Sequence, residues 1–488
     1  LHLSIRRQRQ MCIRDRAVTV TNTSNVSDGT VAVGNQALTA LTSGGSNTAV
    51  GYQSMDATTT GGGNTALGYQ SLSGDTDGNG ADNTALGHKT LLTATSPSKN
   101  VAIGDSAMRY MDASADSIAN CVAIGANAFA GHTDTTTGAN GTVAIGKDAL
   151  TALTTGAGNV AIGMDALKTE DAGNYNTAVG HQALTTQNST DAGNTAVGYT
   201  AGAAITTGYN NTMVGKDVMD ALTAGACNVA LGSGALGVAA LTESSNVAIG
   251  CDAMSAVAEH SGGSSSANNN IAIGQDAMTG GALASGENFD SNIAIGQAAM
   301  NSTGGEEQTG TIAIGSSALT ALTSGSNNVS IGYQSMSETT GGNYNTAIGY
   351  QAMYRDAGLA NTHNTFIGQG IASGDWTTTA STHNTGVGSG AFGSAMQGAT
   401  NNTGIGVDAL SALTTGTGNV ALGSGALDGT NDGHNNVAIG YGALSANAGD
   451  GSVAIGKSAL AALTSGAGNV AVGYQSLDAE DDGDFNTA

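Results

Sequence analysis

One five-residue phrase recurs along the chain and constrains its fold more than any other feature. It reads Asn, then Thr, Val or Ile, then usually Ala, then an aliphatic residue, then Gly; residues 159–163 are one copy. The closing glycines follow one another at a basic step of 17 residues, as from Gly34 to Gly51, and at most 24 residues separate them, from Gly250 to Gly274. A short period that tolerates insertions is typical of a solenoid, in which each repeat is one coil stacked on the last.

The phrase itself predicts a short strand. We number its Asn as position 1, so that Gly is position 5, and call these coil positions. Positions 2 and 4 are β-branched or aliphatic, whereas position 3 is nearly always Ala, with Met213, Ser330, Phe366, Gly386 and Gly404 as exceptions. Such alternation is typical of a strand whose positions 2 and 4 share one face. We expect positions 2, 4 and the Leu or Met of position 9 to face inward, for example Ile162 and Leu167, and Ala to face outward.

These patterns predict an all-β fold, a parallel β-solenoid or β-roll of about 25 coils with a basic period of 17 residues. The segment after the Gly corner, such as residues 148–156, suits either a second strand or one short helical turn. Stacked asparagines at position 1 should form an amide ladder. Aromatic residues make up 4% of the chain and Pro97 is its one proline, so the core is thin and a backbone ladder meets almost no interruption.

The composition divides the chain into three segments. Residues 1–16 carry five of the thirteen basic residues and are interpreted as a non-native or unstructured basic lead, with a nucleic-acid-binding arm as the alternative. Residues 17–29 form an irregular segment that leads into the repeats, and residues 30–488 form the solenoid. Because Asn486, Thr487 and Ala488 begin another copy of the phrase, we expect the solenoid to be truncated at its C-terminal end.

The repeated phrase carries a family resemblance. Residues 159–163, 246–250 and 436–440 read Asn-Val-Ala-Ile-Gly, which resembles the head repeat of trimeric autotransporter adhesins of the YadA type. The longer unit at residues 345–353 is similar to repeats in phage tail fibres. The resemblance covers residues 30–488 and implies an extracellular β-roll, on a bacterial cell surface or a virion tail fibre, and usually trimeric. The period departs from the family, because the adhesin repeat is shorter.

Charge and motifs narrow the functions. Outside the basic lead, eight Lys and Arg accompany 36 Asp and Glu, a net charge of −28 that disfavours nucleic acid and anionic membranes as partners. No membrane segment is present in the sequence. No nucleophile elbow, phosphate-binding loop, zinc spacing or calcium loop occurs, so we expect no enzyme, no cofactor and no resident metal. A homotrimer of the full-length protein stays open, but we expect weak or absent association of this chain alone.

A few residues rise above this background as candidate sites. His363 and His383 precede the Asn of successive copies, so stacking would bring their imidazoles together; they are the metal candidates, with an incidental exposed pair as the alternative. Tyr333 and Tyr350 would stack after the Gly corner and are candidates for sugar binding, although stacking that stabilises the coils is the alternative. Trp376 lies in an insertion and is the third binding candidate. Any ligand edge should be formed by residues 255–269, 279–291 and 372–382.

The first hypothesis for function is a non-enzymatic structural or adhesive shaft or head of a surface or virion fibre, which presents loops to a host glycan or protein. An ice-binding solenoid is the alternative, because Thr48, Thr65 and Thr84 would stack at position 2. Val and Ile also occupy that position, which favours an inward role over an ice face. A polysaccharide-degrading β-helix is the third hypothesis.

Overall fold

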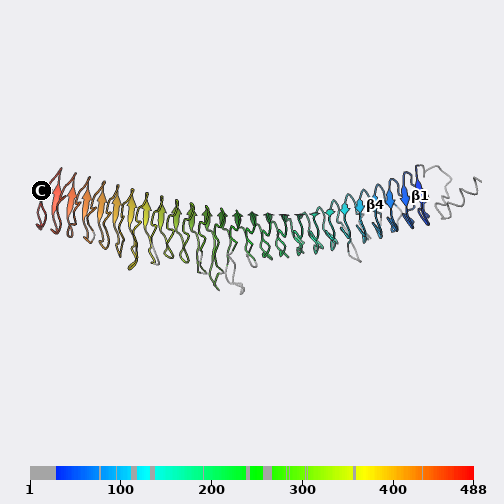
Figure 1. Cartoon of the computed structure of the whole chain (residues 1–488), viewed down its shortest axis with the longest axis horizontal. Helices are drawn as coiled ribbons and strands as arrows, with labels where there is room; N and C mark the ends of the chain where they lie inside the picture. Colours follow the sequence, from blue (N-terminus) through cyan, green and yellow to red (C-terminus); the bar gives the residue numbers. More distant parts are fainter. Residues whose placement is uncertain are drawn as a thin grey trace, which may run out of the picture. The chain divides into compact units, whose positions relative to one another are not determined.

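The computed structural model describes residues 29–488, except 76–78, 95, 112–117, 132–137, 191, 238–241, 256–265, 282, 285, 303, 305, 356–358 and 431. These residues form stacked coils, each with one strand of three residues (Figure 1). The chain divides into two compact units, with the boundary between Gly234 and Ala235. No helix is present among the described residues. The predicted lead, residues 1–16, and most of the predicted segment 17–29 lie outside the described residues.

The first unit contains twelve strands: β1 (Val31–Val33), β2 (Thr48–Val50), β3 (Thr65–Leu67), β4 (Thr84–Leu86), β5 (Val101–Ile103), β6 (Val122–Ile124), β7 (Val143–Ile145), β8 (Val160–Ile162), β9 (Thr177–Val179), β10 (Thr195–Val197), β11 (Thr212–Val214) and β12 (Val229–Leu231). The second unit contains thirteen: β13 (Val247–Ile249), β14 (Ile271–Ile273), β15 (Ile293–Ile295), β16 (Ile312–Ile314), β17 (Val329–Ile331), β18 (Thr346–Ile348), β19 (Thr365–Ile367), β20 (Thr385–Val387), β21 (Thr403–Ile405), β22 (Val420–Leu422), β23 (Val437–Ile439), β24 (Val453–Ile455) and β25 (Val470–Val472).

Within each unit, consecutive strands pair in parallel and keep the coil positions in register. Val160 of β8 lies opposite Thr177 of β9, and Val453 of β24 lies opposite Val470 of β25. The prediction of an all-β parallel solenoid with a period of 17 residues is therefore confirmed. Equal positions lie beside each other in neighbouring coils because every insertion enters outside the strand, where it does not shift the register.

The turn after the strand is neither a helix nor a second strand. Positions 7 and 9 both adopt left-handed backbone angles, for example φ 58° at Asp165 and φ 48° at Leu167. Side chains other than Gly rarely adopt this region, so other contacts must hold it. Bonds between coils do so: the Asp165 N–H donates to the Lys147 carbonyl at 3.0 Å, and the Leu167 N–H donates to the Ala183 carbonyl at 3.0 Å.

The core lies on the opposite face of the strand from the one predicted. Position 3 points inward: Ala161 is completely buried, whereas Ile162 is 37% exposed and Val160 is partly exposed. The prediction that positions 2 and 4 face inward and Ala faces outward is wrong. The alternation was identified correctly, but its phase was inverted, and a shift of one residue exchanges the two faces of a strand. Position 9 is inward as predicted, since Leu167 is completely buried.

The physical reason is the narrow width of the coil. Position 3 faces position 9 across the core, and the exceptions to Ala show how little space there is. Where Met213 replaces Ala, position 9 of the preceding coil is Gly202, whose added Cβ would lie 2.7 Å from the Met213 sulfur. An Ala opposite a Leu or Met fills the same space. Two β-branched side chains per strand, in addition to position 9, exceed this volume, so they lie outside.

The glycine at position 5 is required by the stacking of coils. Gly163 has φ 137°, and a Cβ added there would lie 2.2 Å from the backbone carbonyl oxygen of Gly180 in the next coil. Neither atom can move without shifting the backbone. The Gly corner is therefore a close approach between coils as well as a turn.

Position 1 forms the predicted amide ladder. The Oδ1 atom of Asn211 accepts the backbone N–H of Asn228 at 2.9 Å, and its Nδ2 donates to the Gly225 carbonyl at 2.8 Å. The side chain is buried, so these bonds satisfy polar groups that water cannot reach. The residue before each such position has a left-handed backbone, for example φ 55° at Asn210 and φ 54° at Gly193; we call it position 0.

Candidate functional site

The predicted tyrosine pair stacks. The ring centroids of Tyr333 and Tyr350 are 5.6 Å apart with 14° between the planes, and about half of each residue is exposed. Tyr52 and Tyr69 form an equivalent stack at 5.4 Å, which His88 extends at 5.3 Å. Because the facing ring surfaces cover each other, no sugar ring fits between them. Any contact with a ligand would use the outer edges and end faces of these stacks.

The two candidate metal ligands also stack. His363 and His383 have ring centroids 4.8 Å apart and nearly parallel planes, and Tyr344 continues the stack at 5.0 Å from His363. The predicted proximity of the imidazoles is therefore confirmed. Neither histidine belongs to a cluster of three or more metal-ligating side chains; in the described part of the chain such a cluster is formed by Glu480, Asp481 and Asp482, near the C-terminal end. The stack supports an aromatic ladder more than a metal site.

Trp376 is completely buried and packs edge-on against Phe366, with the ring centroids 6.1 Å apart. Phe392 packs against the same ring of Phe366 at 5.3 Å. Gly386, at position 3, makes room for them, since an added Cβ would lie 2.7 Å from Phe366. The burial argues against Trp376 as a binding residue, because no part of its ring reaches the surface. It fills a core that Gly386 and Gly404 would otherwise leave empty.

Part of the predicted ligand edge lies outside the described residues. This applies to residues 256–265 of the first insertion and to residues 282 and 285 of the second. In the described part of the second insertion, Phe289 and Leu283 are buried. These side chains add to the core, so this insertion is anchored by its own apolar residues.

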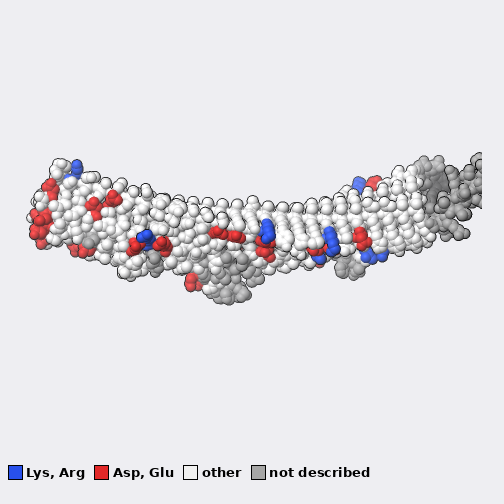
Figure 2. All heavy atoms as spheres, viewed as in Figure 1, with Lys and Arg blue, Asp and Glu red and all other residues white. Residues whose placement is uncertain are grey.

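The outward face of the strands has a uniform composition in each unit, and we call it the strand face. It consists of positions 2 and 4 of β1–β12 and of β13–β25, and every one of these residues is Thr, Val, Ile or Leu. Several are substantially exposed, including Leu67 at 45% and Leu422 at 45%. No charged residue lies on this face within the described strands. Charged side chains occur elsewhere, in small groups separated by wide uncharged areas (Figure 2).

Threonine is not scattered over the strand face but occurs in runs at position 2. Three runs are outward-facing: Thr48, Thr65 and Thr84; Thr177, Thr195 and Thr212; and Thr346, Thr365, Thr385 and Thr403. Beside each run, position 4 forms a row of Val, Ile or Leu. The structure therefore removes the objection that free exchange of Thr with Val and Ile indicates an inward position.

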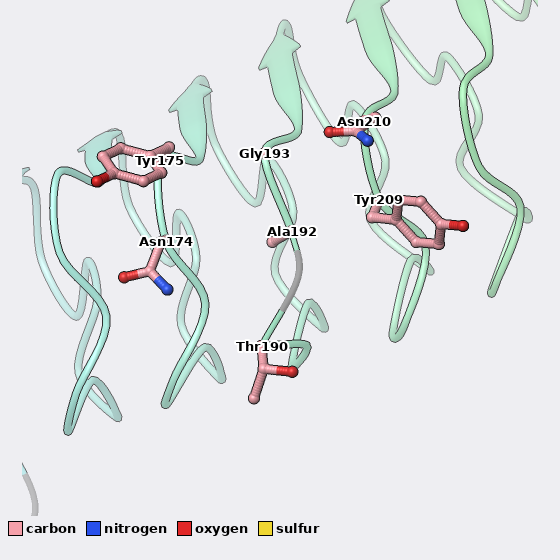
Figure 3. A pocket seen from close by; sticks show the side chains of 7 residues that line it. All are labelled: Asn174, Tyr175, Thr190, Ala192, Gly193, Tyr209 and Asn210. Carbon is pink, nitrogen blue, oxygen red and sulfur yellow. The ribbon is translucent and has the colours of Figure 1, made fainter.

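A notch interrupts one edge of the first unit (Figure 3). Asn174, Tyr175, Thr190, Ala192, Gly193, Tyr209 and Asn210 line a pocket of about 570 Å³. Gly193 occupies position 0 of the middle coil, where Tyr175 and Asn210 stand in the coils on either side. The sequence pattern did not predict a site at these residues. The signal that could have found them is a position-0 Gly directly after a position-0 Tyr.

One buried carboxyl group is perturbed in the neighbourhood of the notch. Burial raises the pKa of Glu170 above its usual value of 4.5, although the backbone N–H groups of Gly173 and Ala172 donate to it and oppose the shift. Glu170 takes the place of Leu153 of the preceding coil, and Gln187 follows it in the next. Its carboxylate closes a turn by accepting these two N–H groups, which indicates a structural role.

Comparison with protein family models and with curated proteins finds no match for this chain. The resemblance to adhesin heads and tail fibres is thus a prediction from the repeat phrase alone. No helix with the length and apolarity needed to cross a membrane occurs in the described part of the chain.

Proposed function

We propose that this protein is a non-enzymatic structural segment of a fibre on a cell surface or virion, and that its strand face packs against further copies of the same chain. The observation that carries the proposal is the composition of that face. Two rows of Thr and aliphatic residues run along every described strand of both units without a charge. Exposed apolar areas of this extent mark interaction surfaces in soluble proteins.

The regular spacing indicates what can cover this face. Neighbouring parallel strands lie about 4.8 Å apart, so the rows repeat at that interval. A partner without the same interval would fall out of register after a few coils. A second copy of this chain has the same interval and the same rows, and it can match the face over many coils. This favours a symmetric homo-oligomer, as the resemblance to trimeric adhesin heads also implies.

The earlier expectation of weak association relied on placing the aliphatic residues inside and Ala outside. Because that placement is wrong, each strand offers two large side chains for association rather than one methyl group. Burial of apolar surface stabilises association by roughly 25 cal/mol per Å² before its entropic costs. A long shared face of this kind supports a stable oligomer.

Sedimentation of the purified repeat region at micromolar concentration tests the proposal, and we expect an oligomer. Two substitutions on the strand face, Ile145→Lys with Ile162→Lys, should give folded monomers because the charges would be buried in the interface. The control is Tyr333→Lys with Tyr350→Lys, which places two charges at exposed residues away from the strand face. A monomeric wild-type protein, or equal effects of the two pairs, would contradict the proposal.

The outward threonine runs favour a second candidate, an ice-binding surface. Ice also has a fixed repeat, and a flat row of Thr hydroxyl and methyl groups beside an aliphatic row could order water at regular intervals. A thermal-hysteresis assay tests this function. Replacement of Thr177, Thr195 and Thr212 by Lys should lower the hysteresis, since it removes one of the three runs, and absence of hysteresis in the wild-type protein would remove this candidate.

A further inference from the structure

We propose that the notch at Gly193 is a binding site for a neutral carbohydrate. The inference deepens the proposed fibre function, since it names the ligand class that the fibre would hold. It depends on the geometry of three consecutive coils of the first unit, whose strands are β9, β10 and β11.

Position-0 side chains usually lean toward the preceding coil and cover it. A Cβ added to Gly158 would lie 2.9 Å from Cδ1 of Tyr175, and one added to Gly193 would lie 2.9 Å from Oδ1 of Asn210. The Tyr175 ring therefore covers Gly158 on one side. The other face of the Tyr175 ring would normally be covered by the position-0 side chain of the next coil. That position is Gly193, which has no side chain, so this face of the ring is uncovered.

The notch is therefore an open slot that is one coil wide. Figure 3 shows Tyr175 and Asn174 on the coil before Gly193, and Tyr209 and Asn210 on the coil after it. Thr190, Ala192 and Gly193 form the floor. Tyr175 is 74% exposed, which is far more than the stacked Tyr333 at 48%. An aromatic ring exposed to this degree beside an empty slot offers a stacking surface that the closed tyrosine stacks lack.

The polar groups around the slot are suited to form hydrogen bonds with the hydroxyl groups of a ligand. The Asn174 Oδ1 atom accepts the backbone N–H of Ala157 at 2.8 Å, which fixes the amide and leaves its Nδ2 donors without a partner among the described residues. The Asn210 amide adds an acceptor, since its oxygen lies on the Gly193 side of its coil (Figure 3). Binding sites typically combine apolar surface with a few oriented polar groups of this kind.

The lining does not favour an anionic ligand. None of the seven described lining residues is ionisable at neutral pH, so these residues offer no positive charge to a phosphate or carboxylate group. A neutral sugar has apolar C–H faces that stack on Tyr175 and hydroxyl groups that bond to the amides. Its size also fits, because a slot of about 570 Å³ accommodates one or two sugar rings.

The variant that tests the site is Gly193→Asn. Asn occupies position 0 with the same left-handed backbone in six described coils, as Asn120, Asn210, Asn269, Asn327, Asn401 and Asn435, so this substitution fills the slot with a residue that the fold accepts. The matched control is Gly310→Asn. A Cβ added to Gly310 would lie 2.9 Å from Oδ1 of Asn327, the same distance and partner type as at Gly193.

Binding is measured with immobilised neutral oligosaccharides of glucose, mannose, galactose and N-acetylglucosamine, with sialylated glycans for comparison. We expect the wild-type protein and Gly310→Asn to bind one neutral class equally, and Gly193→Asn and Tyr175→Ala to bind at least tenfold more weakly. Absence of neutral glycan binding by the wild-type protein would overturn the proposal, as would unchanged binding by Gly193→Asn. Sedimentation of the same samples keeps the two proposals apart, because failure to oligomerise would refute the fibre interface without affecting the measured binding.

Discussion

Each coil has a part whose sequence is nearly constant and a part whose length and sequence vary. Positions 1 to 5, 8 and 9, which hold the Asn, the strand, the Gly corner and the Ala-Leu turn, keep nearly the same residues in both units, whereas position 0 keeps its left-handed backbone but varies in residue. The segment from position 10 to the next position 0 varies in length, with seven residues between Leu150 and Gly158 and fourteen between Met254 and Asn269. The first part is constant because every atom in it meets its equivalent in the next coil. The second part meets its equivalent only partly and can change.

The comparison predicts that a charge in the constant part is costly or harmless according to its face. Ala161→Asp should destabilise its coil by roughly 3–5 kcal/mol, because it buries an unpaired carboxylate. Ile162→Asp, one residue further on, should cost within about 1 kcal/mol in the monomer, because its side chain is outward. Hydrogen exchange of the amides of β7, β8 and β9 measures both. Equal protection losses would contradict the assignment of the faces.

The sequence predicted the period, the parallel strands, the Gly corner and the amide ladder because these depend on repetition. It could not predict which strand face is inside, because Ala-in and Val-out produce the same alternation as the reverse. The choice depends on the width of the coil, which position 9 and turns with left-handed angles determine. The stacks of Tyr333 with Tyr350 and of His363 with His383 could be predicted because the members of each pair occupy the same position in neighbouring coils. The burial of Trp376 and the notch at Gly193 could not be predicted, because they depend on whether the residues at neighbouring positions of other coils are small.

The Gly corner tests whether contact between coils, rather than backbone angle, requires glycine. At Gly163, with φ 137°, an added Cβ meets the Gly180 carbonyl oxygen at 2.2 Å, whereas at Gly141, which also has a positive φ of 68°, it meets nothing within 4 Å. Gly163→Ala should therefore destabilise its coil by roughly 1–3 kcal/mol more than Gly141→Ala. Local hydrogen exchange, relative to wild type at each site, gives the two costs. Equal costs would assign the requirement to the backbone angle alone.

In the variable part, the buried carboxyl group of Glu170 predicts a pH dependence. Burial raises its folded-state pKa above 4.5, so the folded state binds the proton more tightly than the unfolded state does. The resulting stabilisation is fully present below pH 4.5 and is lost as the pH rises through the raised pKa. Hydrogen exchange of residues 170–176 should show falling protection over that range.

Glu170→Gln is the matched variant for this pH dependence, since Gln187 occupies the equivalent place in the next coil. It should remove the local dependence and leave that of distant coils unchanged. The same slope in both proteins would assign the titration to other carboxylates.

The smallest effect is expected where equal side chains meet outside the core. Tyr350→Ala removes the partner of Tyr333, but both rings are about half exposed, and the stack should contribute only about 0.5–1 kcal/mol. Tyr175→Ala should cost less still, because that ring covers Gly158 and stacks on no other aromatic ring among the described residues. Thermal unfolding and local hydrogen exchange measure both. A loss well above 2 kcal/mol for either would show that the aromatic rows hold the coils together. Near-neutral values would leave Tyr175 free to serve a ligand, since its exposed ring would then contribute little to the fold.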